Sequence, residues 1–176
     1  GNGIGTADSD RNFDSDGFKN LYGKVSFDMG GQNVGVYVYS GREENPVGIR
    51  NEFVRVGPDF NFFVFEDWNL WGNFLYGRDS NGRFATSGSQ GEIESWGGFA
   101  GVTKKLNEDW ILSLLYNRVK VYGREELDAN TLTANLSYFL MRNLKFMAEF
   151  TGDLEETDRF HPAKEHTGVL GIVLAY

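Results

Sequence analysis

The chain of 176 residues contains no cysteine, three prolines and two histidines. The absence of thiols excludes a disulfide scaffold, a thiolate metal site and covalently attached c-type haem. The net charge of -8 and the pI near 4.8 leave no basic face for phosphate groups, so nucleic acid is not a predicted partner. No apolar run reaches the roughly 20 residues that a membrane-spanning helix needs.

Aromatic residues and glycine are abundant instead. Aromatic side chains make up 15% of the chain, and there are 23 glycines. Together with the scarcity of proline, this composition favours β-structure. The mean hydropathy of -0.40 is a poor guide in such a chain, because residues that alternate between two faces of a strand cancel in any average.

Apolar and polar residues alternate with a period of two along most of the chain. In the clearest segment, Leu132, Ala134 and Leu136 alternate with threonine, asparagine and serine. This period is typical of a β-strand with one apolar and one polar face. The pattern predicts nine strands, at residues 18–29, 33–41, 51–64, 68–78, 93–105, 109–122, 130–140, 144–152 and 168–176.

The connections between these strands alternate in length. Short ones are expected at 30–32, 65–67, 106–108 and 141–143, and long polar ones at 42–50, 79–92, 123–129 and 153–166. In an antiparallel meander, every second connection lies at the same end of the sheet. Short turns therefore gather at one end and long loops at the other, and a soluble sandwich has no reason to sort its loops in this way.

The last nine residues end the chain on an apolar strand that finishes with an aromatic side chain. Gly171, Leu174 and Tyr176 resemble the C-terminal signal of bacterial outer-membrane β-barrels, in which a glycine precedes two spaced hydrophobic residues, the last of them aromatic. The polar residue that usually stands two places before the glycine is Val169 here. The loop asymmetry is also typical of these barrels, which have short periplasmic turns and longer extracellular loops.

This resemblance, which covers residues 18–176, implies an all-β, antiparallel up-and-down transmembrane β-barrel in the outer membrane of a Gram-negative bacterium. It also implies contact with outer-membrane lipid and recognition of Gly171, Leu174 and Tyr176 by the barrel assembly machinery. Single-chain bacterial barrels have an even number of strands, whereas about nine are counted here. Either the chain is the C-terminal portion of a larger barrel, the preferred interpretation, or the count is wrong by one. Residues 1–17 are then expected to form an acidic extracellular loop.

Two places interrupt the alternation. Pro58 predicts a bulge or a locally unpaired position, because proline cannot donate a hydrogen bond to the ladder. Arg118 and Lys120 fall on the apolar side of their strand. Either a bulge near Asn117 switches the phase, or these two cations lie above the membrane.

The polar side of the alternation predicts the lining of a lumen. Its charges balance, so the sequence indicates no clear ion selectivity. Unpaired buried polar groups cost about 1–3 kcal/mol each, so these side chains require either a water-filled channel or a plug of mutually hydrogen-bonded groups. The predicted lumen-lining residues are Lys24, Asp28, Tyr37, Tyr39, Arg55, Asp59, Asn61, Asn73, Asn135, Lys145 and Glu149.

The predicted function is a porin-like channel for passive diffusion of small hydrophilic solutes. One alternative is a barrel that sheathes or supports a partner, such as a periplasmic protein or a multihaem cytochrome, and other copies of the chain are further possible partners. A second alternative is a soluble β-barrel that binds an apolar ligand between inward-facing apolar surfaces. No cofactor is predicted.

Other motifs carry little chemistry. Asp8, Asp10, Asp14 and Asp16 place oxygens at alternate positions, but the pattern lacks the glycine and glutamate of a calcium-binding EF-hand loop. His161 and His166 are expected to be surface residues. No catalytic constellation is found, so the chain is not predicted to be an enzyme. Trp68, Trp110, Tyr76 and Tyr116 are expected to form interfacial aromatic girdles.

Overall fold

The computed structural model describes residues 20–45, 48–85, 91–155 and 166–174. These residues form a single antiparallel sheet of nine strands in which spatial order follows chain order. The strands are β1 (Leu21–Met29), β2 (Gln32–Glu44), β3 (Arg50–Phe65), β4 (Trp68–Asp79), β5 (Ile93–Lys105), β6 (Trp110–Val121), β7 (Ala129–Met141), β8 (Leu144–Asp153) and β9 (His166–Leu174). One 3-10 turn, η2 (Glu125–Leu127), precedes β7, and the described ranges contain no α-helix. The predicted all-β, up-and-down antiparallel fold is confirmed.

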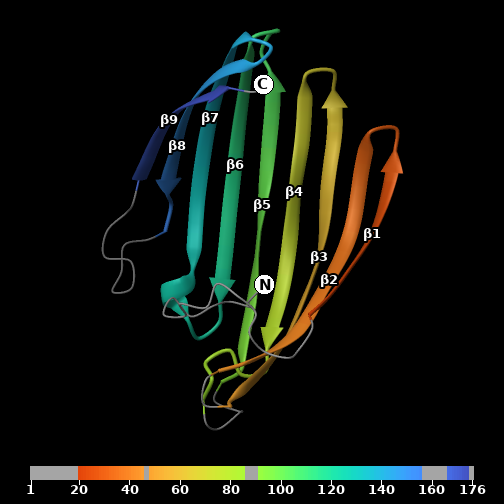
Figure 1. The fold of residues 1–176 in the computed structure, drawn as a ribbon, viewed down its shortest axis with the longest axis vertical. Helices are drawn as coiled ribbons and strands as arrows, with labels where there is room; N and C mark the ends of the chain where they lie inside the picture. The colour runs from red at the N-terminus through yellow and green to blue at the C-terminus, as the bar shows by residue number, and fades with distance from the viewer. Residues whose placement is uncertain (1–19, 46–47, 86–90, 156–165, 175–176) are drawn as a thin grey trace.

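Short and long connections lie at opposite ends of the sheet, as predicted. Figure 1 shows the short turns at the top and the longer connections at the bottom. The β2–β3 connection is shorter than the predicted 42–50, because β2 continues to Glu44 and β3 begins at Arg50. An ion pair between these two residues, with 2.8 Å from Arg50 Nε to Glu44 Oε2, joins the two strand ends.

The β1–β2 turn illustrates how the sequence determines a tight connection. Gly30 and Gly31 form the two-residue turn, and their φ angles are +62° and +87°. A hairpin turn that matches the twist of its strands requires positive φ at both central positions, which glycine adopts without steric cost. Consecutive glycines therefore fix this hairpin and its register.

The register resolves both interruptions of the alternation. β6 pairs without a shift from Val121 to Ile111, so no bulge occurs near Asn117, and Arg118 and Lys120 stay on the apolar side. Pro58 pairs with β2, but positions 57 and 58 have no partner on β4, while the register is the same on both sides of them. Pro58 is thus the locally unpaired position of the two predicted alternatives, and the predicted bulge near Asn117 is absent.

Two register shifts that the alternation does not predict lie beside short turns. One lies between Phe63 and Phe65 in the β3–β4 pairing, and the other between Phe139 and Met141 in the β7–β8 pairing. Bulges of this kind increase the local twist. Neither shift changes which side chains share a face over the rest of the strands.

β1 and β9 form the two edges of the sheet. No pairing joins them in the part of the chain that the structure describes, so the sheet is open. Figure 1 shows the sheet twisted and curved, with β1 and β9 on opposite sides of the view. Closure into a barrel would require a β1–β9 pairing or further strands.

Little apolar surface is buried. Among the described residues only three hydrophobic side chains are buried, those of Phe53, Ile93 and Val121. They lie close to the long connections, on the same side of the sheet as the predicted lumen-lining residues. A search of the described residues for a helix long and apolar enough to cross a membrane finds none.

Candidate functional site

All eleven predicted lumen-lining residues lie on one side of the sheet. The register pairs Lys24 with Tyr37, and Tyr39 with Arg55, and it joins Asp59 to Asn73 on β4. The same side continues through β5 and β6 to the Asn135–Glu149 and Phe139–Lys145 pairs. We call this side, defined by those eleven residues, the polar face. The opposite side, which carries Leu70, Leu114, Leu132 and Phe146, is called the apolar face.

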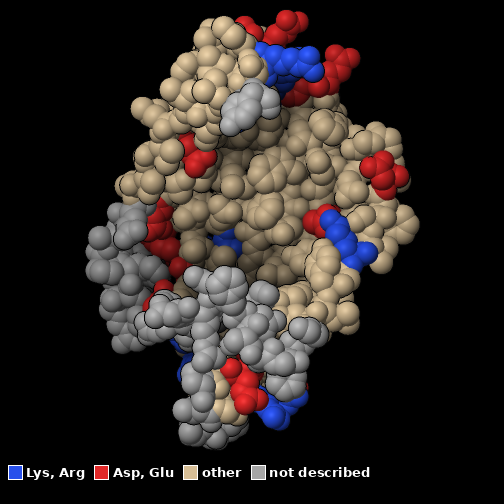
Figure 2. Space-filling view, viewed as in Figure 1, with Lys and Arg blue, Asp and Glu red and all other residues tan. Residues whose placement is uncertain are grey.

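Exposure is inverted relative to a protein folded in water. Along β4, the apolar-face side chains of Leu70 and Phe74 are 39% and 45% exposed. On the polar face of the same strand Asn73 is half-buried, and Asp79 is buried. Figure 2 shows the molecule hollowed in the middle of one side, with acidic and basic groups among uncharged ones. Polar side chains therefore face the inside of the curved sheet, and apolar ones face out.

A salt bridge joins β1 to β3 on the polar face. Lys24 Nζ lies 2.8 Å from Asp59 Oδ1, and both side chains keep part of their surface exposed. The other carboxylate oxygen, Asp59 Oδ2, is buried and accepts no hydrogen bond from the described residues. Gly35 makes room for this oxygen, because a Cβ there would lie 3.0 Å from it. Beside the pair, Asn73 Nδ2 donates to the Tyr37 hydroxyl over 3.5 Å.

A second ion pair on this face is buried. Arg55 Nη2 donates to Asp79 Oδ2 at 2.6 Å, and the two side chains are 8% and 2% exposed. Asn51 Nδ2 donates to Asp79 Oδ1 and to Glu43 Oε1, both at 2.9 Å. Gly77 provides space for the guanidinium, since a Cβ at that position would lie 2.9 Å from Arg55 Nε. Arg55 therefore lies on the predicted face but is buried against its neighbours, so it does not contact solvent there.

The chain just after β4 is fixed to the same network. The backbone N–H of Asn81 donates to Asn51 Oδ1 at 2.9 Å. The Asn81 side chain closes a small loop by accepting a hydrogen bond from the Ala85 N–H and donating one to the Ala85 carbonyl. Asn51 and Asn81 are buried together with Asp79. Residues 80–85 are thereby held against the polar face at its long-connection end.

Polar side chains from β4 to β8 form a series of hydrogen bonds, all of them between strands except Ser137–Asn135 within β7. Trp71 Nε1 donates to Thr103 Oγ1 at 3.2 Å, and Ser137 Oγ donates to Asn135 Oδ1 at 3.0 Å. The other pairs are Thr103 with Ser113, Asn117 with Thr131, Thr133 with Thr151, and Asn135 with Glu149. These pairs satisfy one another and remain mostly half-buried, which produces a nearly neutral polar surface.

The remaining predicted lining residues occupy the ends of the same face. Asp28 Oδ1 accepts a hydrogen bond from the Gly31 N–H in the β1–β2 turn. Asn61 bonds to Asn69, and Tyr39 accepts a hydrogen bond from Asn20 at 2.9 Å. Lys145 Nζ lies 5.9 Å from the centre of the Phe139 ring. None of these groups meets another in a catalytic arrangement.

The predicted girdle residues Trp68, Trp110, Tyr76 and Tyr116 all lie on the apolar face. Near the short turns, Lys104 Nζ lies 4.6 Å above the Trp68 ring. Trp110 packs on Tyr138 there, with 4.7 Å between ring centres. Toward the long connections, Tyr76 pairs with Trp96 across β4 and β5. Aromatic side chains thus occur toward both ends of the apolar face.

In β9, Leu174 lies on the apolar face and is 65% exposed, whereas Gly171 lies on the polar face opposite Met147. Tyr176, Asp8, Asp10, Asp14, Asp16 and His161 lie outside the described residues. No group of three or more potential metal ligands occurs in the part of the chain that is described.

In η2, a hydrogen bond from Arg124 lowers the pKa of the exposed Glu126 carboxyl.

Several residues of the polar face were not in the predicted set. Asn51 and Asp79 are the most important, because they hold Arg55. Asn51 lies at the first position of the predicted strand 51–64, on the same side as Arg55, and Asp79 falls in the predicted long loop 79–92, although the β4 alternation continues to it. Tyr138 and Trp96, which the alternation places on the apolar side, continue the aromatic rows of the apolar face.

Comparison with known proteins adds no family to this description. No protein-family model matches the chain, and no curated protein matches it significantly.

Proposed function

We propose that this chain forms part of the wall of an outer-membrane β-barrel that acts as a porin-like channel. In this proposal the apolar face contacts lipid, and the polar face lines a water-filled lumen through which small hydrophilic solutes diffuse passively. The observation that carries the proposal is the inverted exposure of the two faces.

The free-energy cost of exposing these apolar side chains to water argues that an apolar medium covers the apolar face. Burying a leucine or phenylalanine side chain is worth about 1.5–3 kcal/mol, and a whole domain is stable by only about 5–15 kcal/mol. The apolar face leaves many such side chains open, including Phe27, Phe150 and Leu170 at 67%, 55% and 87% exposure. A hydrocarbon layer removes this penalty for all of them at once.

The dimensions and the charges of the apolar face fit a bilayer. Trp68 and Arg78 lie at the two ends of β4, ten residues apart. At about 3.3 Å per residue and a tilt of about 40°, this separation spans about 25 Å, the height of the lipid-facing band of such barrels. On this face Arg78, Glu94 and Lys104 lie at the ends of β4 and β5, whereas Lys120 and Arg118 on β6 lie one and two rows further in, beside Trp96 and Gly98.

The polar face supports diffusion without strong charge selectivity. Its pairs Lys24–Asp59 and Arg55–Asp79 each cancel. Hydroxyl and amide groups lie between them, together with Trp71, Phe99 and Leu115. A soluble barrel with an apolar interior would need the opposite arrangement, because the apolar face is here the more exposed one.

The four tryptophans offer a direct test. Trp68, Trp96 and Trp110 lie on the apolar face, and Trp71 lies on the polar face as a matched control. Variants that keep one tryptophan each, with phenylalanine at the other three, are placed in vesicles of phosphatidylcholine with brominated acyl chains. We expect quenching of the three apolar-face tryptophans, and quenching of Trp71 by aqueous iodide only. Equal lipid quenching of Trp71, or no lipid quenching at any position, would contradict the proposal.

Conductance then separates a channel from a sheath. The purified protein, as it exists in its membrane, is added to a planar lipid bilayer. Steady, water-filled pores support the porin-like function. A barrel that inserts but stays closed in the absence of a partner would instead favour the scaffold alternative.

A further inference from the structure

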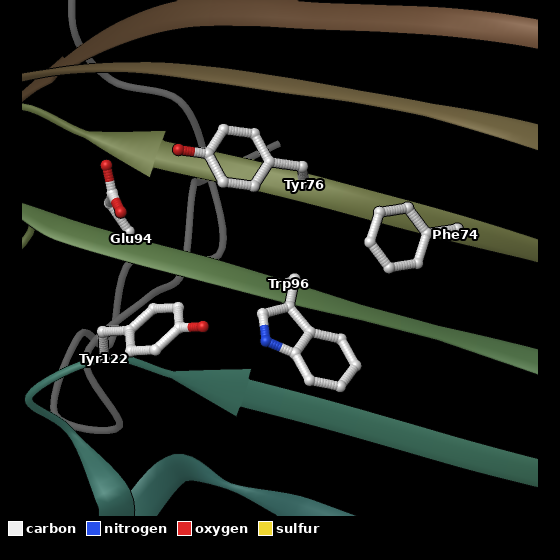
Figure 3. A pocket seen from close by; sticks show the side chains of 5 residues that line it. All are labelled: Phe74, Tyr76, Glu94, Trp96 and Tyr122. Atoms are coloured by element: carbon white, nitrogen blue, oxygen red, sulfur yellow. The ribbon is translucent and has the colours of Figure 1, made fainter.

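A shallow groove crosses the apolar face near the long connections. It is lined by Phe74, Tyr76, Glu94, Trp96 and Tyr122. Figure 3 shows these side chains rising from β4, β5 and the end of β6, with the Tyr76 hydroxyl directed toward Glu94 and the Tyr122 hydroxyl directed toward Trp96. The groove is continuous with the exposed apolar surface of β4, so a long apolar chain could enter it from the side.

The register explains the shape of the groove. Phe74, Gly98 and Arg118 form one row across the three strands, and Tyr76, Trp96 and Lys120 form the next row toward the long connections. Gly98 lies between Phe74 and Arg118 in its row, and a Cβ there would lie 2.3 Å from the carbonyl oxygen of Asn73 on β4. The rings of Phe74 and Trp96 stack in the groove, with 6.2 Å between their centres and 24° between their planes.

Arg118 is the distinctive charge at this site. Its guanidinium carbon lies 6.0 Å from the centre of the Trp96 ring, so the side chain extends from its own row toward the next one. It forms no ion pair with any residue in the described ranges, whereas Arg78 donates to Glu92 at 2.7 Å, and Lys120 lies 3.2 Å from Asp128. An unpaired cation beside apolar surface is costly unless an anion or water reaches it.

We propose that this groove binds one anionic lipid, with its phosphate on Arg118 and an acyl chain along Phe74 and Trp96. The inference rests on the proposed membrane function, since the ligand must come from the surrounding lipid layer. Guanidinium groups bind phosphate oxygens in pairs, and flat aromatic rings with an apolar edge provide the contact for a chain. Glu94, the acidic side chain of the groove, faces the Tyr76 hydroxyl. Arg118 is the cation next to the apolar surface, and this combination is the chemistry that binds such a lipid.

The test compares two tryptophans on the same face. Trp96 lies under Arg118. Trp110 is the control: it lies on the same face near the short turns, and it follows two acidic residues, Glu108 and Asp109. Single-tryptophan variants of the full chain are placed in phosphatidylcholine vesicles that contain a small fraction of brominated phosphatidylglycerol. Each cation near anionic head groups contributes about 1 kcal/mol, so we expect about fivefold stronger quenching at Trp96 than at Trp110.

Arg118→Gln should abolish this preference at Trp96, whereas Arg78→Gln, which removes a cation already paired with Glu92, should leave it nearly unchanged. Brominated phosphatidylcholine should quench both tryptophans alike in every variant.

Three outcomes would overturn the inference. Equal quenching of Trp96 and Trp110 by the anionic lipid would remove the site while leaving the membrane proposal intact. Persistence of the preference in Arg118→Gln would show that this cation is not the ligand. Loss of the preference when inorganic phosphate is added at millimolar concentration would show that the anion binds without its chain. No quenching by any brominated lipid would contradict the proposed function itself.

Discussion

At the scale of single residues, the polar face contains two ion pairs in different surroundings. The Lys24 and Asp59 side chains are 35% and 20% exposed, whereas those of Arg55 and Asp79 are 8% and 2% exposed. An exposed pair contributes little to stability, because water solvates both charges after the pair is broken. Breaking a buried pair leaves a charge that water cannot reach.

We therefore predict that Asp79→Ala lowers the free energy of unfolding by about 3–5 kcal/mol, the cost of leaving a buried guanidinium unpaired. Lys24→Ala, the matched change in the exposed pair, should cost at most about 1 kcal/mol. Urea unfolding in detergent micelles, followed by tryptophan fluorescence, measures both. Similar losses in the two variants would contradict the assignment of Arg55–Asp79 as a buried structural pair.

At the scale of elements, the backbones of β3 and β4 leave no room for a side chain at Gly57, where the two strands are not paired. Positions 57 and 58 have no register partner on β4, and a Cβ on Gly57 would lie 1.7 Å from the carbonyl oxygen of Phe74. The clash is with backbone, so no change of rotamer relieves it. The glycine before Pro58 thus permits the two strands to stay in register across the gap.

Gly57→Ala is expected to push β3 away from β4 and to lower stability by about 1–3 kcal/mol or more, as overpacking does. Gly23→Ala is the control, because the nearest side-chain atom to a Cβ there is 3.7 Å away, an ordinary contact. That change should stay within about 0.5 kcal/mol. The same unfolding measurement compares the two, and equal stability of both variants would show that the strands shift freely at this place.

At the scale of the whole molecule, the polar and apolar faces run across all nine strands, but the sheet has two free edges. β9 is one of them, and its apolar side chains Leu170 and Ile172 are 87% and 66% exposed. Unpaired edges are templates for pairing with further strands. This geometry is compatible with the interpretation that Gly171, Leu174 and Tyr176 form an assembly signal.

Deletion of Tyr176 is therefore predicted to reduce insertion into the outer membrane, because the signal would lose its terminal aromatic residue. The folded fraction is measured in membrane extracts by the shift in gel mobility between heated and unheated samples. Val173→Ala, on the polar face of the same strand, should leave this fraction unchanged. Normal insertion and normal heat-modifiable mobility of the deletion variant would exclude the signal.

The sequence predicted much of the fold because a β-strand with one apolar and one polar face produces an alternation between neighbouring residues. Alternation with a period of two placed all nine strands and both faces, and Gly30 with Gly31 indicated the first tight turn. The alternation placed Arg55 on the correct face but did not predict its burial. Asn51 and Asp79 were missed because they lie at strand ends: Asn51 is the first residue of the predicted strand 51–64, and Asp79 falls in the segment predicted as the polar loop 79–92.

By itself, the sequence determined the strands, their order and the face of each side chain, since these depend on residues that are neighbours along the chain or in one hairpin. Only the tertiary structure decided which polar groups are paired. The Arg55–Asp79 and Lys24–Asp59 contacts join residues 24 and 35 positions apart, and the alternation specifies a face without specifying distance along it. The groove at Trp96 also emerges only when three strands lie in register, because Gly98 and Arg118 become neighbours through pairing and not through the sequence.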